Sequence, residues 1–418
     1  MNEVSSPEKE GIARQRMAEA AISRSRVRAE DARRTRTAKT ATALLFVVIL
    51  LAAFVGVGAA NGLFDSLGSA DSVKVVDRQK AAGTIQTKTV IDSQGRKVIV
   101  PINPNSIAAM DPFSGELLVM CGAGSKICGI PGGVLSDKIL QQIYPGLTTE
   151  PAQLSGNSVN IETLVERSCD VVLVRGSLPD SERAKLDRVG IPYVVVEYST
   201  MDGQIAAMRL VGEVCGGEAQ QKAEALAKYY EDVLTEVRSK AVHIPDDKRL
   251  RVYHSINNIL LTDARDSLGA DWITVVGCIN VSAGMEQTSG TDYSTSVEQI
   301  YTWNPDVIIC NVTSTARSTR DESKWSGLAA VSKGRVYHIP VGATRWGQRG
   351  DVETYLAVLW LGHTLYPEYY SDRDFKQRVV DYYRDYLGIK VDDELYELIL
   401  SGEGIRAEGT DGGGGVGR

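Results

Sequence analysis

The chain has 418 residues, of which 43% are apolar and 24% are charged, enough for about two domains of ordinary size and additional segments. Its net charge of −7 is unevenly distributed: residues 1–39 contain ten Lys and Arg against six Asp and Glu, and the remaining residues contain 36 against 47. Nucleic-acid binding needs clustered Lys and Arg that displace counterions, so the acidic body of the chain argues against a nucleic-acid partner.

Residues 41–60 form an apolar run of twenty residues without a charge. A helix of this length rises about 30 Å, at roughly 1.5 Å per residue, which is the thickness of the hydrocarbon core of a bilayer. Seven Lys and Arg lie between Arg24 and Lys39, just before this run. The positive-inside rule therefore predicts a single-pass protein of the cell membrane, with its N-terminus in the cytoplasm and its body outside. The predicted segments are a cytoplasmic basic segment (1–39), a transmembrane anchor (40–63) and a stalk (64–84).

Two other readings of this apolar run remain open. A signal peptide is possible because Gly58, Ala59 and Ala60 are small enough for a cleavage site, although the preceding region is long and the run exceeds the usual length. Arg33 and Arg34 are a weak indication of twin-arginine export. No Cys follows the run until Cys121, so a lipid-modified cysteine at this place is excluded.

A first α/β lobe is predicted over residues 85–214. Two β-branched runs flank a turn at Gly95 and predict a β-hairpin at the start of this lobe. Strands that alternate with helices indicate a parallel sheet with both faces covered. The predicted strands are 106–110, 126–130, 170–174 and 192–196.

Residues 215–244 interrupt this alternation with one long helix. Apolar residues recur in it with a period of 3.6, and no Gly or Pro occurs between Gly217 and Pro245. At about 25 residues the helix spans roughly 37 Å, the size of a lobe. We predict that it joins the two lobes as a rigid strut.

A second α/β lobe is predicted over residues 245–406, with strands at 251–254, 306–310 and 335–339. The tail (407–418) contains four consecutive glycines and is predicted to be disordered.

One short pattern occurs once in each lobe. Asn160 and Ser296 are capping residues that are each followed two positions later by a glutamate, Glu162 and Glu298. In both copies a short amphipathic helix follows, and then an apolar β-branched run that is typical of a buried parallel strand. The helix dipole, worth about 0.3–1 kcal/mol, explains each glutamate singly. It explains less well why both lobes have one at the same turn.

Six cysteines are present, and in an exported body they can pair. Cys121 and Cys128 are close in sequence and are the favoured bridge, but six cysteines allow fifteen complete pairings. Buried free thiols are the alternative for Cys169, Cys215, Cys278 and Cys310. The absence of a CxxC motif, with only four scattered histidines, argues against a structural zinc site.

The sequence contains none of the catalytic motifs sought in it. It has no P-loop, no GxSxG elbow and no HExxH, and Gly122 and Gly124 lack the third glycine of a dinucleotide fingerprint. No pair of acidic residues stands out as general acid and base. We therefore predict that the protein is not an enzyme, with no catalytic residue, no resident cofactor and no metal ligand.

The loops that follow the predicted strands are the candidate ligand site, because ligands of parallel α/β sheets bind beyond the carboxyl ends of the strands. Arg345, Trp346 and Arg349 cluster among glycines after a strand, and provide cationic and stacking groups for an anionic or conjugated ligand. Core packing of Trp346 beside solvated arginines is the alternative. For Tyr253 and His254, packing in the core is the commoner reading. The predicted ligand-binding residues are Phe113, Arg175, Tyr198, Tyr253, His254, Tyr293, Arg345, Trp346 and Arg349.

Several motifs together resemble the ABC-importer substrate-binding proteins for iron complexes (siderophore or haem) and vitamin B12. They are VIDSQGRKVIVP (90–101), NIETLVERSCDVVLV (160–174), SVEQIYTWNPDVII (296–309) and AVSKGRVYHIP (330–340). The resemblance covers about residues 85–390. It implies two Rossmann-like α/β lobes with central parallel sheets, joined by one long helix, with a ligand in the cleft and little hinge motion.

The resemblance also assigns a role to the repeated glutamates, since one Glu on each lobe of such proteins docks onto arginines of the permease. By motif position these are Glu162 and Glu298. The chain departs from the family pattern in having Ser168 and Cys169 where a Pro usually precedes the Asp. It also has a predicted membrane anchor in place of a lipid-modified cysteine or a simple signal peptide.

From these observations we expect an extracytoplasmic binding protein that captures a metal chelate and delivers it to an ABC permease dimer. The expected ligand is a ferric siderophore first, then haem, then a corrinoid. One rival is a membrane-anchored sensor that signals through residues 1–39 without transport. Another is an anchored α/β metal-handling enzyme, such as a chelatase.

Overall fold

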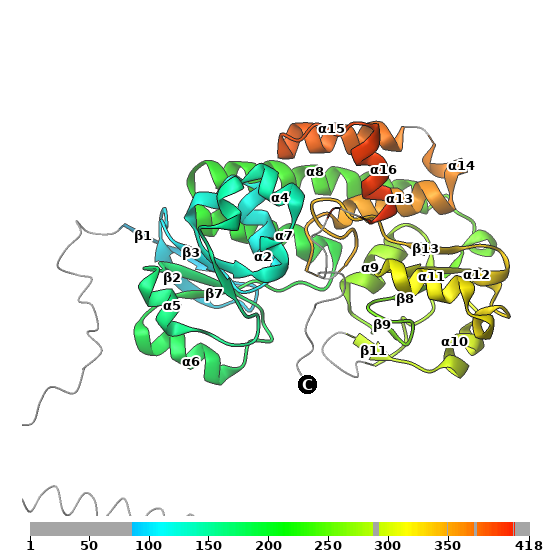
Figure 1. Ribbon diagram of the computed structural model, residues 1–418, viewed down its shortest axis with the longest axis horizontal. Helices are drawn as coiled ribbons and strands as arrows, with labels where there is room; N and C mark the ends of the chain where they lie inside the picture. Colours follow the sequence, from blue (N-terminus) through cyan, green and yellow to red (C-terminus); the bar gives the residue numbers. More distant parts are fainter. Residues whose placement is uncertain (1–85, 287–291, 349, 372–373, 404, 406–418) are drawn as a thin grey trace, which may run out of the picture. The chain divides into compact units, whose positions relative to one another are not determined.

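The computed structural model describes residues 86–286, 292–348, 350–371, 374–403 and 405 (Figure 1). The predicted cytoplasmic segment, membrane anchor and stalk, and the glycine-rich tail, lie outside these residues. None of the helices in the described part has the length and apolar character needed to cross a bilayer.

The N-terminal lobe (N-lobe) is built on a parallel sheet of five strands in the order β5-β4-β3-β6-β7. An antiparallel hairpin precedes it, as the sequence predicts. The hairpin strands are β1 (Thr87–Ile91) and β2 (Lys97–Pro101). The sheet strands are β3 (Ile107–Ala109), β4 (Ile127–Pro131), β5 (Ala152–Leu154), β6 (Val171–Val174) and β7 (Tyr193–Val195).

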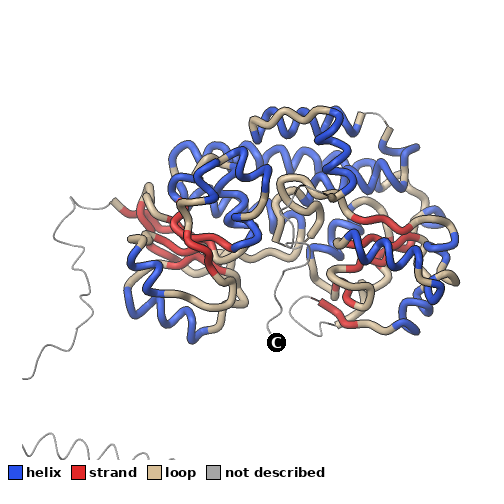
Figure 2. The backbone as a smooth tube through the Cα atoms, viewed as in Figure 1, coloured by secondary structure: helices blue, strands red, loops and turns tan. Residues whose placement is uncertain are grey.

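Helices cover both faces of this sheet. Successive residues of a strand point to opposite faces, so each face has its own set of core residues. Ile107 and Val171 face the core under α2 and α7, whereas Ala108 and Val172 face the core under α5 and α6 (Figures 1 and 2). The N-lobe helices are α2 (Pro112–Met120), α3 (Gly132–Leu135), α4 (Lys138–Ile143), α5 (Ile161–Glu166), α6 (Asp180–Val189) and α7 (Met201–Cys215). Short 3-10 turns occur at Gly124–Lys126 and Pro145–Thr148.

The long helix predicted at 215–244 is α8 (Gly217–Ala241). It starts after Gly216, which has φ of 67°, a conformation that ends α7 and that residues with a side chain rarely adopt. One stripe of α8 is buried, including Leu226, Tyr230 and Val237, and the helix packs on α7 of the N-lobe and on α9, α13 and α14 of the C-terminal lobe. It therefore joins the two lobes through side-chain packing.

The C-terminal lobe (C-lobe) contains a mixed sheet in the order β11-β9-β8-β12-β13, with β10 beside β8. Strands β8, β10, β12 and β13 are mutually parallel, but β9 runs antiparallel to β8 and to β11. The central strands of this lobe are therefore parallel, as predicted, and the antiparallel edge formed by β9 and β11 was not expected. The strands are β8 (Arg251–Ser255), β9 (Leu261–Asp263), β10 (Ile279–Asn280), β11 (Asp292–Ser294), β12 (Val307–Cys310) and β13 (Val336–His338).

The described residues of the C-lobe also contain a set of helices. They are α9 (Leu268–Val275), α10 (Val297–Trp303), α11 (Thr313–Asp321), α12 (Ala329–Ser332), α13 (Thr354–Leu365), α14 (Pro367–Tyr370), α15 (Phe375–Leu387) and α16 (Asp393–Ser401). Two 3-10 turns lie at Asp246–Lys248 and Ser323–Trp325.

Cys121 and Cys128 are buried free thiols, so the expected Cys121–Cys128 bridge is absent. The sheet itself explains this. Cys121 packs in the core between the N-lobe sheet and α7, whereas Cys128 packs with Cys169 in the core on the opposite face. Closeness in sequence across a helix-to-strand junction does not bring the two thiols to one side of the sheet.

Candidate ligand-binding site

Three N-lobe strands end at one small pocket, which we call the N-lobe pocket. Asp111 follows β3, Arg175 follows β6 and Tyr198 follows β7, so parallel pairing brings these distant residues to one edge of the sheet. Gly350, from the C-lobe segment after β13, completes the lining. The pocket volume is about 30 Å³.

The two carboxyl oxygens of Asp111 have different surroundings at this edge. Its Oδ1 accepts a hydrogen bond from the Ser114 backbone nitrogen (3.0 Å) and caps α2, while its Oδ2 is buried without a hydrogen-bond partner among the described residues. Burial raises the pKa of Asp111, and the Arg175 guanidinium opposes part of that rise. The pocket therefore places a cation beside a carboxyl group that is unusually easy to protonate.

Tyr198 forms an aromatic wall of the N-lobe pocket. Its ring packs on Phe113 with 4.7 Å between centroids, and its hydroxyl is buried without a hydrogen bond to any described residue. Burial raises the pKa of this hydroxyl, which therefore stays protonated. Phe113 is fully buried behind Tyr198 and does not line the pocket.

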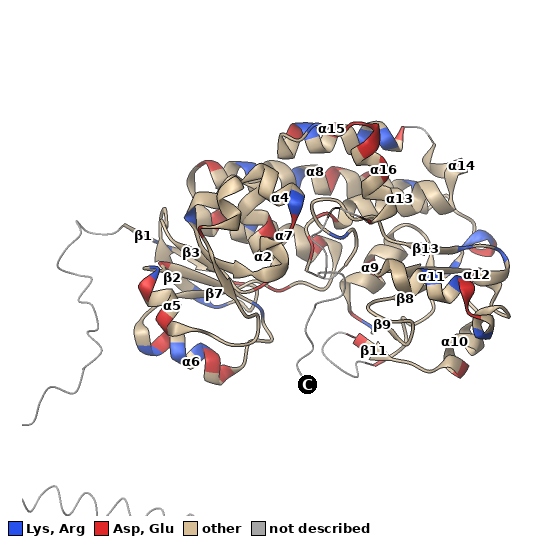
Figure 3. Ribbon diagram, viewed as in Figure 1, with Lys and Arg blue, Asp and Glu red and all other residues tan. Residues whose placement is uncertain are grey.

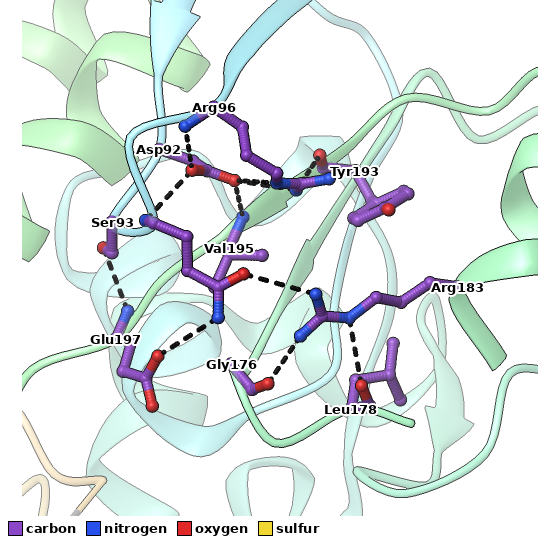
Figure 4. A network of polar contacts seen from close by, with 10 residues as sticks. Asp92, Ser93, Arg96, Gly176, Leu178, Arg183, Tyr193, Val195 and Glu197 are labelled. Carbon is purple, nitrogen blue, oxygen red and sulfur yellow. Dashed lines mark hydrogen bonds and ion pairs between the residues drawn. The ribbon is translucent and has the colours of Figure 1, made fainter. Parts of the chain in front are cut away.

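The turn of the entry hairpin supports two loops of this pocket (Figure 4). Ser93 Oγ accepts a hydrogen bond from the Glu197 backbone nitrogen (3.0 Å), and Arg183 donates to the Gly176 carbonyl. Gln94 bonds to both Arg183 (3.2 Å) and Glu197 (3.5 Å). Because Gly176 and Glu197 line the pocket, the hairpin turn helps to hold their loops in place.

The segment 341–350 after β13 is held by buried acidic residues that follow it. Asp351 Oδ2 accepts a hydrogen bond from the Arg345 backbone nitrogen (2.9 Å), and Glu353 Oε2 accepts one from the Thr344 backbone nitrogen (2.8 Å). Glu353 is fully buried, and burial raises its pKa to about 8. This carboxyl group is therefore mostly protonated at neutral pH.

The N-lobe contacts the residues that end this segment. Glu116 on α2 accepts a hydrogen bond from the Val352 backbone nitrogen (3.2 Å), and Gln204 on α7 donates to the Asp351 carbonyl (2.8 Å). Gly350, with φ of 95°, comes so close to Arg175 that a Cβ there would lie 3.1 Å from Nη2. The segment therefore bridges the two lobes beside the N-lobe pocket.

A larger pocket of about 230 Å³, the C-lobe pocket, lies at the ends of β12 and β13. Arg345 is 7% exposed and its Nη1 donates to Gln348 (3.2 Å). Arg317 pairs with Glu403 at 3.2 Å on the exposed side. The remaining lining comes from strand-end and helix-start residues, Asn311, Val312, Thr313 and Ser314, and from Val341 and Gly402.

None of the other described residues that were predicted to bind ligand lines either pocket. Trp346 is fully buried with its ring edge-on to Phe375, and Tyr253 is fully buried and donates to the Ile259 carbonyl. Tyr293 lies half-buried on β11. His254 is buried within the C-lobe sheet, and Arg349 lies outside the described residues.

The structure thus brings Arg175 and Tyr198 together, and places Arg345 in the second pocket. Asp111, Asn311 and Gly350 lie in strand-end loops that were predicted to line the site but were not singled out, and Arg317 was not expected. Asp111 and Asn311 directly follow strands that were predicted, so strand-end position was the available signal. Within the described residues, no group of three or more His, Cys, Asp or Glu is arranged to hold a metal ion.

Glu162 and Glu298 are both exposed in the first turns of α5 and α10. Asn160 Oδ1 accepts from the Thr163 backbone nitrogen (3.1 Å), and Ser296 Oγ accepts from the Gln299 backbone nitrogen (3.2 Å), so both helices begin with the predicted cap. Backbone and Ser296 hydrogen bonds lower the pKa of Glu298. Both helices lie on the side of their lobes away from α8, and both display acidic residues (Figures 1 and 3).

Comparisons with known proteins agree with this architecture. A model described as periplasmic binding protein matches residues 107–341. The molybdate-binding protein MolA of Haemophilus influenzae is 27% identical over 338 residues, covering 72% of this chain and 90% of MolA. An ABC transporter substrate-binding lipoprotein of Bacillus subtilis, YvrC, is 24% identical over 291 residues, covering 68% of this chain and 87% of YvrC.

A solved periplasmic solute-binding protein from Veillonella parvula superposes with a TM-score of 0.63 at 26% identity. The superposition covers 75% of this chain and 97% of that protein. The fold of this chain therefore matches nearly the whole length of that solved protein.

Proposed function

This chain belongs to the periplasmic binding protein family, and we propose that it captures an anionic metal species outside the cell membrane and delivers it to an ABC permease. It is an ABC transporter substrate-binding protein, a class that binds ligands and does not act as an enzyme. Such proteins work with a permease and an ATPase. Ligand identity, anchoring and docking residues are the parts that we propose.

For the ligand we propose a small metal oxyanion such as molybdate ahead of a ferric siderophore, haem or a corrinoid. The observation that carries this choice is that Arg175 and the buried carboxyl group of Asp111 line the N-lobe pocket together. A protonated Asp111 is able to donate a hydrogen bond to an oxyanion beside the guanidinium. The similarity to a molybdate-binding protein supports the same class.

The ligand class is testable by equilibrium dialysis of the purified full-length chain against molybdate, a ferric siderophore, haem and cobalamin, with the bound metal quantified. We expect molybdate to bind, and Arg175→Ala to weaken its binding at least about tenfold, because one charged hydrogen bond contributes about 1.5–3 kcal/mol. The matched control is Arg188→Ala, an exposed arginine on α6. Binding of a chelate but of no oxyanion would overturn the ligand class and leave the receptor function in place.

For docking we propose that Glu162 and Glu298 contact arginines of the permease. Their exposure at equivalent, capped helix starts of the two lobes supports this role. Exposed carboxylates of this kind are available to a partner without the cost of breaking a buried ion pair.

For localisation we propose that residues 40–63 anchor the protein as a single-pass membrane helix with residues 1–39 in the cytoplasm. The basic residues before the apolar run support this orientation. The cytoplasmic segment also favours the rival function, a sensor that does not transport. A permease and an ATPase encoded next to this chain would support the importer, and transport of labelled ligand into cells would decide between the two.

A further inference from the structure

Three side chains at neighbouring strand ends of the C-lobe form a buried hydrogen-bonded chain. His254, on β8, places Nδ1 2.5 Å from Asp263 Oδ2 on β9 and Nε2 2.7 Å from Asn311 Oδ1, just after β12. All three residues are at least 95% buried, since the largest exposed fraction is 5%. No step of the proposed function yet uses this chain of contacts.

The partners of His254 determine its protonation state. Both ring nitrogens lie within hydrogen-bonding distance of side-chain oxygens, an arrangement that favours a proton on each nitrogen and therefore an imidazolium. Burial lowers the pKa of His254, but the charge and hydrogen bond of Asp263 outweigh it and the pKa is raised, with Asp292 on β11 acting in the same direction. The Trp272 ring on α9, with its centroid 5.5 Å from that of the His254 ring, adds no charge.

The imidazolium in turn determines how Asn311 is oriented. With Oδ1 accepting from His254, the planar amide directs Nδ2, a donor, away from the ring. Asn311 is also part of the C-lobe pocket. The amide therefore presents N–H groups to that pocket.

The rest of the C-lobe pocket is rich in donors. Arg345 and Arg317 contribute guanidinium groups, and Thr313 and Ser314 contribute hydroxyls. One carboxylate, Glu403, also lines the pocket and is paired with Arg317. Asn311 and Arg345 are the buried donors of this set. Buried donors discriminate strongly against ligands that cannot accept hydrogen bonds, because such ligands leave the donors unpaired.

We propose that the C-lobe pocket binds an oxyanion group, that Asn311 is a specificity-determining donor to it, and that His254 and Asp263 are the positioning residues that orient Asn311. The inference rests on the proposed function and deepens it, since it names the chemistry by which the C-lobe takes part in oxyanion binding.

This arrangement has a consequence for pH. If His254 loses a proton, Nδ1–H stays on Asp263 and Nε2 becomes an acceptor, so Asn311 must turn its N–H₂ toward the ring and its oxygen toward the pocket. An oxygen there repels an oxyanion. Affinity for the oxyanion should therefore be full at low pH and fall as the pH rises through the pKa of His254.

The positioning part is testable without any ligand. In full-length protein labelled with ¹⁵N-histidine, we expect His254 to show two protonated ring nitrogens at pH 7, and Asp263→Asn to convert it to a neutral ring. Only four histidines are present, so a His254→Gln variant assigns the signal. A neutral His254 in the wild-type protein at pH 7 would overturn the inference.

The specificity part is testable with molybdate, tungstate, sulfate and phosphate as probes. Asn311→Asp preserves the shape of the side chain and replaces donors by a charged acceptor, so we expect at least a tenfold loss of oxyanion affinity. Asn257→Asp adds the same charge elsewhere in the C-lobe and should change affinity less than twofold. Equal affinities of the wild type and Asn311→Asp would refute the role of Asn311, whereas a wild type that binds none of the probes would refute the ligand class of the proposed function.

Discussion

In the N-lobe pocket, Asp111 Oδ2 and the Tyr198 hydroxyl are buried without hydrogen-bond partners among the described residues. In the C-lobe pocket, by contrast, His254 and Asp263 hold Asn311 in a buried hydrogen-bonded chain. Both pockets occupy strand ends, so topology alone does not account for the difference. Local contacts decide which polar groups are already paired.

The comparison indicates that the two lobes contribute differently to ligand binding. A buried polar group without a partner destabilises the protein by about 1–3 kcal/mol, which a ligand is able to recover by pairing with it. In the C-lobe, His254 and Asp263 are already paired and hold Asn311 in one orientation before binding, which reduces the entropy cost of association. We therefore expect the N-lobe to contribute more to affinity and the C-lobe more to selectivity.

Each lobe exposes one glutamate at a capped helix start, and changing both glutamates is expected to give the largest effect. Glu162→Arg combined with Glu298→Arg should abolish ligand uptake by cells, because two attractive contacts with the permease become repulsive, while ligand affinity stays unchanged. The measurement is uptake of labelled ligand beside equilibrium binding. Glu166→Arg, an exposed change on the same helix as Glu162, is the control and should leave uptake unchanged. Normal uptake by the double variant would exclude the docking role.

Glu353, a buried acid that follows the bridging segment, gives the next largest effect. The pKa of Glu353 is about 8 in the folded protein against an ordinary value of 4.5, so the native state retains a proton that the unfolded chain loses. The contribution of Glu353 to stability is therefore fully present below about pH 4.5. The free energy of unfolding falls by roughly 4–5 kcal/mol as the pH rises from there through about 8. Glu353→Gln should flatten this dependence in urea unfolding curves between pH 5 and about 9. A wild-type curve that does not fall in this range would contradict the assignment.

Gly350 gives a smaller effect that tests how closely the segment approaches the N-lobe pocket. Gly350→Ala should destabilise the protein by about 1–2 kcal/mol, because φ of 95° is unfavourable for alanine, and it should weaken ligand binding by displacing Arg175. Thermal unfolding and ligand titration measure the two effects. Gly133→Ala is the matched control, since a Cβ there meets nothing within 4 Å. Unchanged affinity in Gly350→Ala would show that the segment does not shape the pocket.

The smallest effect concerns the two capped helices. Asn160→Ala and Ser296→Ala each remove one cap hydrogen bond, and each should lower the free energy of unfolding by about 1 kcal/mol. Similar losses in urea unfolding would support the equivalence of the two lobes. If only one of the two variants has a lower free energy of unfolding, the repeat is preserved in sequence but not in its contribution to stability.

The features that the sequence predicted well depend on short-range patterns. The caps at Asn160 and Ser296, the entry hairpin around Gly95 and the apolar stripe of α8 all act within a few residues, so they are readable from spacing alone. The antiparallel edge of the C-lobe sheet could not be predicted from the sequence. Its strands β9 and β11 have only three residues each, too few to display a period.

By itself, the sequence determined two α/β lobes, the long helix between them and one exposed glutamate on each lobe. Tertiary structure alone decided which strand-end residues meet: Trp346 entered the core, Cys128 faced Cys169 and not Cys121, and Asp111 joined Arg175. The physical reason is that periodicity fixes which face of an element is buried, whereas contacts between residues far apart in the chain depend on strand order and on how side chains pack.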